Sequence, residues 1–426
     1  MKTETSIQYE RRHFLKRLGA GSLAAIALPA FANEGHVQLM APNGGSAPDE
    51  KYWEQIQKQF AVPSNLIMLN AANLCPPPTA VNDQVKKMLD GLGKDVSFQY
   101  REQFSEKRKK ALQVLAGFTG VGKEEIGITR NTSESNNIIV NGLDLKPGDE
   151  VLLWDQNHPS NASAWEQRAK RYGFTVKKIS VPADPQWIED LIKPFRDAIT
   201  PRTKLLGFSH ISNTSGIALP AKELCMLAAE KNVLSLVDGA QSFGFLDLNL
   251  KDLGCDFYTG STHKWFMGPL ENGILYVKKE SADSLWPNII SAGWKEGALT
   301  VDEKYCMLGQ RNETTLAGIA ETVNFHQTIG KKNIENRVVQ LNTYLKDQIK
   351  AKVPGATFVT PLPTELSGGV TIISFAGKKP AELSKKLYEA HGIAAAPTGG
   401  IRMSAHIYNT LNDIDKVVKA LQAISV

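Results

Sequence analysis

The fold is decided by two stretches, "SLVDGAQSFG" at residues 235–244 and "YTGSTHKWFMGP" at residues 258–269. The first contains an apolar run that ends in Asp238, and the second continues a similar run. In the second, Lys264 stands between a histidine and an apolar Trp-Phe-Met sequence. Such neighbours strip water from an amine, lower its pKa and make it a nucleophile. The alternative is an ordinary surface lysine, so the interpretation of Lys264 depends on its surroundings.

Short apolar runs alternate with helical patterns through the centre of the 426-residue chain. Runs of this length separated by helices predict a mostly parallel sheet that is covered on both faces. In such a sheet a ligand lies beyond the carboxyl ends of the strands. The runs are "EIGIT" (125–129), "EVLLW" (150–154), "TVKKISV" (175–181), "KLLGFS" (204–209), "VLSLVD" (233–238), "CDFYTG" (255–260) and "GILYV" (273–277).

Polar residues that suit a cofactor follow five of these runs. They are Thr132 and Ser133 after the first, His158 after the second, Asn213 after the fourth, Asp238 and Gln241 at the fifth, and Ser261, His263 and Lys264 after the sixth. Each has an alternative explanation. The two hydroxyls can cap a helix, the first histidine can be a hydrogen-bonded loop residue, and the carboxylate can pair with a structural cation. Their common position at strand ends favours one binding site.

A phosphate site, an acid, a ring-flanking histidine and a lysine together match the needs of pyridoxal 5'-phosphate. The aldehyde of that cofactor forms a Schiff base with lysine, and an acid keeps its pyridine nitrogen protonated. The two opening stretches resemble the class V aminotransferase family of fold-type I enzymes, which includes cysteine desulfurases and isopenicillin N epimerase-like enzymes. The resemblance runs from "MLNAANLCPPP" at residues 68–78 to "IRMSAHIYNT" at residues 401–410.

The resemblance implies an aspartate aminotransferase-like α/β fold. A large domain with a mostly parallel sheet would bind pyridoxal phosphate, and a small α/β domain would follow it. We expect a signal peptide at residues 1–32, a linker at 33–48, an N-terminal helix packing with the small domain at 49–64, the large domain at 65–299 and the small C-terminal domain at 300–426.

The resemblance also implies a role for each residue around the cofactor ring. Lys264 would bond to the cofactor and move the proton at the substrate α-carbon. Asp238 would hold the pyridinium, and Gln241 would donate to the phenolic oxygen. Ala240 would lie under the ring and His158 would stack on its other face. Lys264, Asp238 and His158 are the predicted catalytic residues.

The remaining implied contacts are those to phosphate and substrate. Thr132, Ser133, Ser261 and His263 would bind the phosphate, and Asn213 would lie near the phenolic oxygen and the substrate. Arg402 matches the residue that holds the substrate carboxylate, a bidentate task that suits a guanidinium, and its alternative is a surface ion pair. The family implies a homodimer in which Gln310, Arg311 or Thr315 would reach the neighbouring phosphate.

The four cysteines argue against one branch of the family. Cysteine desulfurases carry a nucleophilic cysteine shortly before the carboxylate-binding arginine, whereas "HGIAAAPTGGIR" at residues 391–402 has none. Cys75, Cys225, Cys255 and Cys306 lie elsewhere, without the spacing of a metal site, and are expected to be buried thiols. The glycines at 117, 120 and 122 lack the preceding strand of a dinucleotide fingerprint, so a nicotinamide-dependent dehydrogenase is not predicted.

The N-terminus predicts export. "ERRHFLKRLGAGSLAAIALPAFA" at residues 10–32 combines a twin arginine, an apolar stretch too short to span a bilayer and a small-x-small site, which is typical of a cleaved twin-arginine signal. Residues 1–32 hold five basic and two acidic residues, so three of the five net positive charges leave with the signal peptide. The nearly balanced remainder favours neither nucleic acid nor an anionic membrane as partner, and no stable membrane anchor is expected.

We therefore expect a periplasmic pyridoxal-phosphate enzyme that acts at the amino-bearing carbon of an amino acid or a peptide-derived substrate. An aminotransferase or an epimerase is the main hypothesis, with the tailoring of a secondary metabolite such as a siderophore as its setting. A lyase that breaks a C–S bond or eliminates a β-substituent is the alternative within the same fold. A non-catalytic protein that only holds the cofactor is the alternative from another class.

Overall fold

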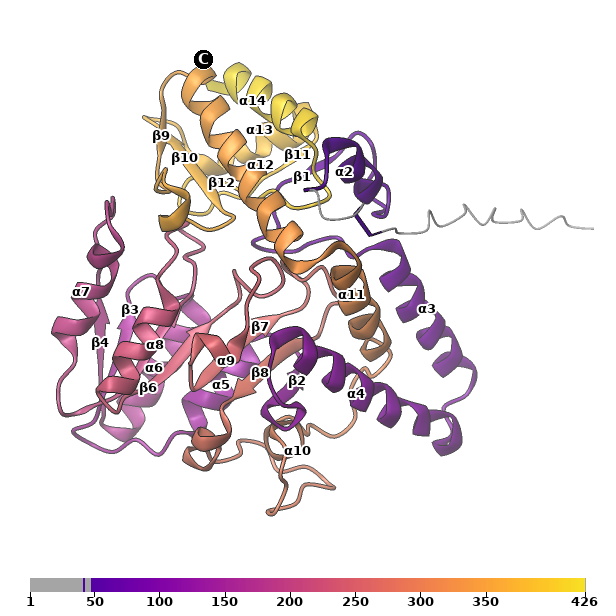
Figure 1. The fold of residues 1–426 in the computed structure, drawn as a ribbon, viewed down its shortest axis with the longest axis vertical. Coiled ribbons are helices and arrows are strands. Elements are labelled where there is room, and N and C mark those ends of the chain that lie inside the picture. Colours follow the sequence, from indigo (N-terminus) through magenta and orange to yellow (C-terminus); the bar gives the residue numbers. More distant parts are fainter. Residues whose placement is uncertain (1–40, 43–46, 426) are drawn as a thin grey trace, which may run out of the picture. The chain divides into compact units, whose positions relative to one another are not determined.

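The computed structural model describes residues 41–42 and 47–425 of the chain. The predicted signal peptide at 1–32 lies outside these residues, as does most of the predicted linker at 33–48. The described part builds a large sheet, a three-stranded sheet and a two-stranded sheet with the helices that cover them (Figure 1). Within it, no helix is both long and apolar enough to cross a bilayer.

The large sheet has seven strands in the order β2-β8-β7-β6-β5-β3-β4. They are β2 (Ile126–Thr129), β3 (Glu150–Trp154), β4 (Thr175–Ile179), β5 (Thr203–Ser209), β6 (Leu234–Asp238), β7 (Phe257–Ser261) and β8 (Gly273–Val277). Strand β8 runs antiparallel to both of its neighbours, and the other pairs are parallel. Each of the seven predicted runs forms one strand, so the mostly parallel sheet is confirmed.

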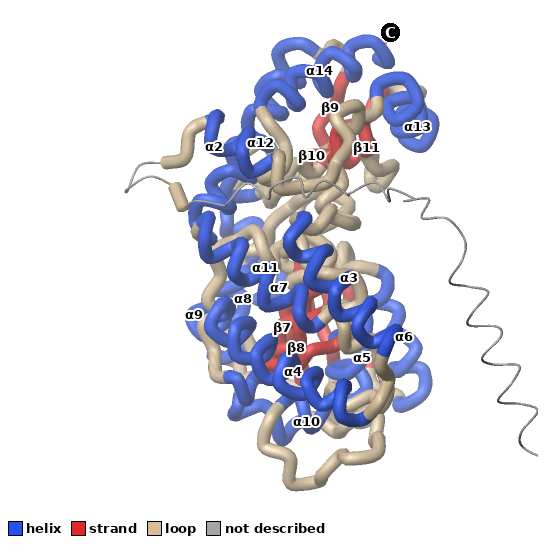
Figure 2. The backbone as a smooth tube through the Cα atoms, turned by 90° about the vertical axis from the view of Figure 1, so that its right-hand side faces the viewer, coloured by secondary structure: helices blue, strands red, loops and turns tan. Residues whose placement is uncertain are grey.

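Helices cover both faces of this sheet, which explains why its strands are continuous apolar runs. In β3, Val151 and Leu153 belong to one apolar cluster while Leu152 and Trp154 belong to another, as the alternation of side chains along a strand requires. Helices α5 and α6 lie on one side of the sheet and α8 and α9 on the other (Figure 2). The helices after the strands are α5 (Thr132–Gly142), α6 (Pro159–Tyr172), α7 (Ile188–Ala198), α8 (Ala221–Glu230) and α9 (Leu250–Leu253).

Further helices pack at the β2 edge of the sheet. Helix α11 contacts α3 and α4, and α10 contacts β2 and β8. Both α10 and α11 follow residue 299 and so belong to the predicted small domain, yet they pack against elements of the predicted large domain. The predicted boundary at residue 299 stays a prediction. The elements are α3 (Thr79–Lys94), α4 (Phe98–Thr119), α10 (Val301–Tyr305), α11 (Leu316–Ile329) and two 3-10 turns, η1 (Lys123–Glu125) and η2 (Lys279–Ser284).

The smaller sheets lie among the C-terminal helices (Figure 1). Strands β9 (Ala356–Phe358), β10 (Thr371–Phe375) and β12 (Ile401–Met403) form an antiparallel sheet with β10 in the middle, and β1 (Ile67–Met68) pairs in parallel with β11 (Ile393–Ala394). The helices are α2 (Glu50–Gln57), α12 (Lys331–Lys352), α13 (Pro380–His391) and α14 (Leu411–Ser425), with a 3-10 turn η3 (Thr364–Leu366). Helix α2 is tied to α12 because Arg337 Nη1 donates to Glu50 Oε2 over 2.7 Å.

Gly244 allows residues 235–244 to pack closely against residues 258–269. Its φ of 105° is a backbone conformation that favours glycine. A Cβ atom at this position would lie 2.3 Å from the backbone of Phe266, which is too close for any other residue. The segment after Asp238 therefore packs directly on the segment that carries Lys264, and both strand ends open on the same edge of the sheet.

Candidate active site

Lys264 lies in the turn that follows β7. It is partly buried between fully buried aromatic and apolar neighbours, among them Trp265 and Phe266. Burial lowers the pKa of the Lys264 amine, while Asp238 raises it and the charge of Arg402 lowers it. The structure therefore rejects the alternative of an ordinary surface lysine. It brings one amine and one carboxylate close enough to interact at the carboxyl edge of the large sheet.

Asp238 ends β6 and is oriented by a hydrogen-bond chain. Its Oδ2 accepts from Asn136 Nδ2 over 2.8 Å, and Asn136 Oδ1 accepts from Thr259 Oγ1 over 2.9 Å. Its Oδ1 accepts from the backbone N–H of Ala240 over 3.0 Å. The cation that the alternative explanation required is not among these hydrogen-bond partners. Asp238 is held in one orientation, as an acid facing a ring nitrogen would need to be.

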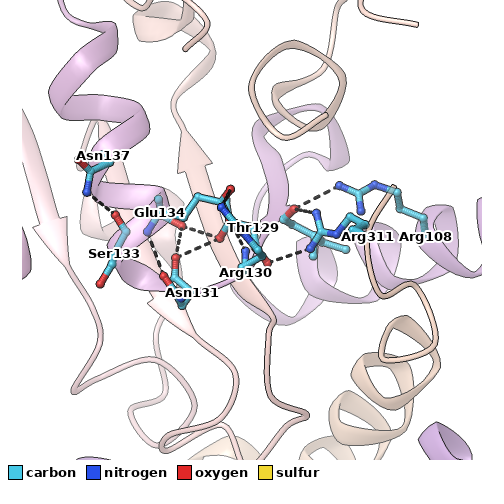
Figure 3. A network of polar contacts seen from close by, with 10 residues as sticks. Arg108, Thr129, Arg130, Asn131, Ser133, Glu134, Asn137 and Arg311 are labelled. Atoms are coloured by element: carbon cyan, nitrogen blue, oxygen red, sulfur yellow. Dashed lines mark hydrogen bonds and ion pairs between the residues drawn. The ribbon is translucent and has the colours of Figure 1, made fainter. Parts of the chain in front are cut away.

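The start of α5 carries the predicted phosphate residues. Thr132 donates its backbone N–H to Ser261 Oγ over 2.9 Å, and the two hydroxyl oxygens lie 2.7 Å apart. The helix is capped by Asn131, whose Oδ1 accepts from the backbone N–H of Glu134 (Figure 3). The alternative that Thr132 and Ser133 serve as the cap is therefore wrong. Hydroxyls from the ends of β2 and β7 converge at the positive end of a helix dipole, a setting that suits an anion.

His263 adds a nitrogen to the site. Burial, followed by the charge of Lys264, lowers the pKa of His263 to about 4, so the ring is neutral at pH 7. Its Nδ1 is buried and has no hydrogen-bond partner among the described residues. A buried ring nitrogen without a partner is costly, so it fits a ligand that would complete the bond.

His158 caps α6. Its Nδ1 accepts from the backbone N–H of Ser160 over 3.2 Å, so it is a hydrogen-bonded loop histidine as one interpretation stated. The residue as a whole remains exposed. Partial loss of water around the ring nevertheless lowers the pKa of His158, as does the charge of Lys264, which lies near the ring. Both interpretations of His158 are compatible, because the cap uses a ring edge and stacking would use a ring face.

Gln241 and Asn213 contact neighbouring protein groups. Gln241 Nε2 donates to the carbonyl of Ala72 over 2.8 Å, and Gln241 Oε1 accepts from Trp265 Nε1 over 2.8 Å. One amide hydrogen of Gln241 is left for a ligand oxygen, since an NH₂ group has two. Asn213 contributes its backbone carbonyl, which accepts from Arg402 Nη1 over 3.4 Å.

Arg402 on β12 is buried, with 5% of its surface exposed. Its Nη2 donates to Asn70 Oδ1 over 3.1 Å, its Nε has no partner, and within the described residues no carboxylate forms an ion pair with it. Burial lowers the pKa of Arg402 to about 10, so it remains charged at pH 7. The surface ion pair is therefore wrong. A buried guanidinium that lacks a carboxylate partner is suited to bind one from a substrate.

Gly399 brings the loop before Arg402 against the large sheet. Its φ is 72°, and a Cβ atom there would lie 2.0 Å from the carbonyl oxygen of Thr214. Only glycine allows the two loops to approach so closely. The four cysteines are buried free thiols, and none of them belongs to this loop. Burial raises the pKa of Cys75 to about 12, which keeps it protonated.

The three candidates for contact with a neighbouring subunit differ in their surroundings. Arg311 Nη1 donates to the carbonyl of Ile128 over 3.0 Å, just before residues 130–133, which join β2 to α5, carry the predicted phosphate ligands and are named the phosphate turn (Figure 3). Thr315 Oγ1 donates to the carbonyl of Asn312, and Gln310 Oε1 accepts from Arg101. Each already has a partner within its own chain, and the prediction that one reaches another subunit stays a prediction.

Sequence reasoning missed Asn136 and Asn70. Asn136 lies four residues after Thr132, one turn along α5 and on the same face, so helix periodicity would have indicated it. Asn70 lies two residues after the end of β1, as other site residues lie shortly after their strands. In the described chain no group of three or more His, Cys, Asp and Glu residues could hold a metal ion.

Residues 70–417 match the model of the family described as aminotransferase class V. This match covers most of the chain, so the protein belongs to the class V aminotransferase family. The predicted pyridoxal-phosphate dependence and the fold-type I architecture are thereby confirmed. The lysine at the end of β7, the carboxylate held by Asn136 and the unpartnered histidine nitrogen fit that cofactor.

Known relatives cover nearly the whole chain. The isopenicillin N epimerase of Streptomyces clavuligerus is 29% identical over 393 residues, which cover 88% of this chain and 98% of the epimerase. A probable cysteine desulfurase of Methanothermobacter thermautotrophicus is 26% identical over 406 residues, covering 87% and 98%. A solved variant of the protein C-DES, with glycine covalently linked to its pyridoxal-phosphate cofactor, has a TM-score of 0.78 at 22% identity, covering 88% and 99%.

The pKa of Lys264 provides a test of the site geometry. Because Asp238 raises that pKa, Asp238→Asn should lower it further, so the neutral amine should appear at lower pH. We would follow acetylation of Lys264 against pH in the cofactor-free protein by mass spectrometry. The midpoint should move to lower pH in Asp238→Asn and stay in place in Asp155→Asn, an exposed carboxylate. An upward shift or an unchanged midpoint would contradict the arrangement.

Proposed function

We propose that the protein is an exported pyridoxal-phosphate enzyme that acts at the α-carbon of an amino acid or peptide-derived substrate, with epimerisation or transamination as the outcome. The observation that carries the proposal is the buried Arg402, which lacks a carboxylate partner within the described chain and interacts with the Lys264 amine. The guanidinium would bind the substrate carboxylate, and the lysine would then face the neighbouring α-carbon.

The other site residues would hold the cofactor. When bound, pyridoxal phosphate supplies an electron sink that makes the α-proton of an amino acid removable. Asp238, fixed by Asn136, would keep the ring nitrogen protonated. Around the ring, Gln241 would donate to the phenolic oxygen, Ala240 would lie under one face and His158 would stack on the other. Thr132, Ser133, Ser261 and His263 would bind the phosphate, with Asn213 beside the substrate.

The charge state of Lys264 suits it to move a proton. Lys264 would hold the cofactor through its Nζ, and the same atom would serve as the acid–base group at the substrate α-carbon. Burial lowers the pKa of this amine, so its neutral form, which can accept a proton, is present at a lower pH than in an exposed lysine. Lys264 would take the proton from the α-carbon and return it to that carbon or to the cofactor.

The loop before Arg402 favours these outcomes over desulfuration. Desulfuration would require a cysteine thiolate in this loop to take sulfur from the substrate. Residues 391–401 contain no cysteine. The relationship to isopenicillin N epimerase at 29% identity supports epimerisation. A lyase that eliminates a β-substituent needs no protein thiol and remains the second candidate. A protein that only holds the cofactor would have no use for a buried arginine without a partner.

Hydrogen exchange at the α-carbon tests this function. A panel of L-amino acids and short peptides would be incubated with the mature enzyme in heavy water. One deuterium with inverted configuration indicates an epimerase, dependence on an added keto acid indicates an aminotransferase, and release of a keto acid with loss of a β-substituent indicates the lyase. Lys264→Ala should abolish exchange, and the absence of exchange with every substrate in the wild type would contradict the proposal.

A matched substrate pair tests the role of Arg402. Arg402→Gln should lower kcat/KM about 100-fold for a substrate with a free carboxylate, because one charge-assisted bidentate contact is lost. For the corresponding carboxamide the loss should be small. Equal losses for both would indicate that Arg402 only supports the fold.

We infer export from the twin arginine at Arg11 and Arg12 and the small-x-small site that ends at Ala32. The twin-arginine machinery carries folded proteins, so the cofactor would be bound before transport. Replacing both arginines by lysine should leave the protein in the cytoplasm of a fractionated cell, and continued export of this variant would contradict the inference.

A periplasmic enzyme of this kind fits the tailoring of an exported metabolite such as a siderophore. Deleting its gene should then change the mass of an exported compound.

We also infer a homodimer. Large apolar side chains lie exposed beside the phosphate turn, with Leu270 59%, Ile289 45% and Ile290 60% exposed. Ile289 and Arg130 line a pocket of about 520 Å³ with Ser133 at the start of α5. A second copy would cover this apolar surface, which is costly to leave in water. Ile290→Asp should give a monomer in analytical ultracentrifugation, whereas Met226→Asp on α8 should not, and a dimer in both would contradict this interface.

A further inference from the structure

The outer edge of β2 is completed by side chains instead of a strand. Strand β2 is the edge strand of the large sheet, and no other strand among the described residues pairs with its outer side. The N–H of Ile128 donates to Asp302 Oδ1 over 2.9 Å. The carbonyl of Ile128 accepts from Arg108 Nη2 over 3.2 Å and from Arg311 Nη1 over 3.0 Å. These three side chains, named the edge clamp, satisfy the backbone groups that an edge strand normally exposes.

The edge clamp is built around a buried ion pair. Arg108 Nε donates to Asp302 Oδ2 over 2.7 Å and Arg108 Nη2 to Asp302 Oδ1 over 2.6 Å. The side chains are 13% and 5% exposed. Arg108 comes from α4 and Asp302 from α10, a helix of five residues. Because a bidentate pair of this kind has one geometry, it fixes where both helices meet the strand.

The edge clamp ends where the phosphate turn begins. Arg311 Nη2 donates to the carbonyl of Thr129, the last residue of β2 (Figure 3). Three residues later stands Thr132, whose N–H and hydroxyl contact Ser261. On the inner side, Thr129 Oγ1 lies 2.7 Å from Ser135 Oγ in α5. The turn between β2 and α5 is therefore held in place by two contacts of Thr129, one with Arg311 of the edge clamp and one with Ser135 of α5.

We propose that Arg108, Asp302 and Arg311 are positioning residues for the cofactor phosphate, an inference that rests on the proposed function. They act through the backbone of Ile128 and Thr129, which sets where the hydroxyls at the start of α5 stand. A ligand anion at this helix start is bound by short directional contacts, so a small shift of the turn lowers its affinity. The competing explanation is that the edge clamp only protects a sheet edge and contributes to stability.

A pair of ligands separates the two explanations. Pyridoxal 5'-phosphate and pyridoxal differ only by the phosphate, and both would react with Lys264. We would measure the affinity of the cofactor-free protein for each by absorbance titration. In Asp302→Ala the affinity for pyridoxal phosphate should fall about tenfold while that for pyridoxal stays within about twofold, because the lost hydrogen bonds act on the phosphate turn alone.

A double variant keeps the test valid if Asp302→Ala does not fold. Arg108→Met with Asp302→Leu replaces the buried ion pair by apolar side chains, an exchange that is often neutral for stability, and still removes two partners of Ile128. The matched control is Arg337→Met with Glu50→Leu, which removes an ion pair between the buried Arg337 of α12 and the partly exposed Glu50 of α2. The control should leave the preference for the phosphate unchanged.

The outcomes distinguish this inference from the proposed function. A wild-type protein that binds pyridoxal phosphate no more tightly than pyridoxal overturns the proposed function and, with it, the phosphate site. A wild type that prefers the phosphate, together with edge-clamp variants that keep the same preference, overturns the positioning role alone. Equal losses for both ligands would show that the edge clamp serves stability.

Discussion

A partly buried lysine, a buried arginine and a buried carboxylate set the conditions for the rest of the site. Lys264 and Arg402 interact across the carboxyl edge of the large sheet, with Asp238 beside them. Burying a charge without a partner costs free energy, and two cations with one anion leave a positive excess. The sheet and its helices provide the packing that offsets this cost. A substrate that carries a carboxylate would offset this excess positive charge, so the charges of the site themselves favour an anionic amino compound.

The sequence could predict the large sheet because its strands are buried on both faces. Such strands are continuous apolar runs, and polar residues at their ends stand out against them. That contrast identified Asp238, Lys264 and Thr132. Strands β6 and β7, which lead to Asp238 and Lys264, pair in parallel, and β2, which precedes Thr132, runs in the same direction as β7 with β8 between them. Arg402 had no such signal, because it lies in the middle of a short antiparallel strand. Only the resemblance to the family indicated it, and the structure shows it buried.

Other features could not be predicted because their partners are far apart in sequence. Arg108 and Asp302 are separated by 194 positions, and neither lies in a pattern that names the other. Helix α10 has five residues, too few for periodicity to reveal a helix. The sequence left open whether Thr132 and Ser133 cap α5, because Asn131, Thr132 and Ser133 are all of residue types that cap helices. In the structure Asn131 is the cap, and the N–H of Thr132 donates to Ser261, a contact with a distant strand that the sequence does not reveal.

One short segment joins the ends of the site. Within residues 70–75, Asn70 accepts from Arg402, the carbonyl of Ala72 accepts from Gln241, and the N–H of Cys75 donates to the carbonyl of His263 over 2.8 Å. These three partners are the residues proposed for the substrate carboxylate, the phenolic oxygen and the phosphate. The segment itself is tied to the small sheet because Ser404 N donates to the carbonyl of Leu69. The spacing between the carboxylate end and the phosphate end is therefore set by a single backbone segment, so the cofactor and the substrate have to fit one fixed length.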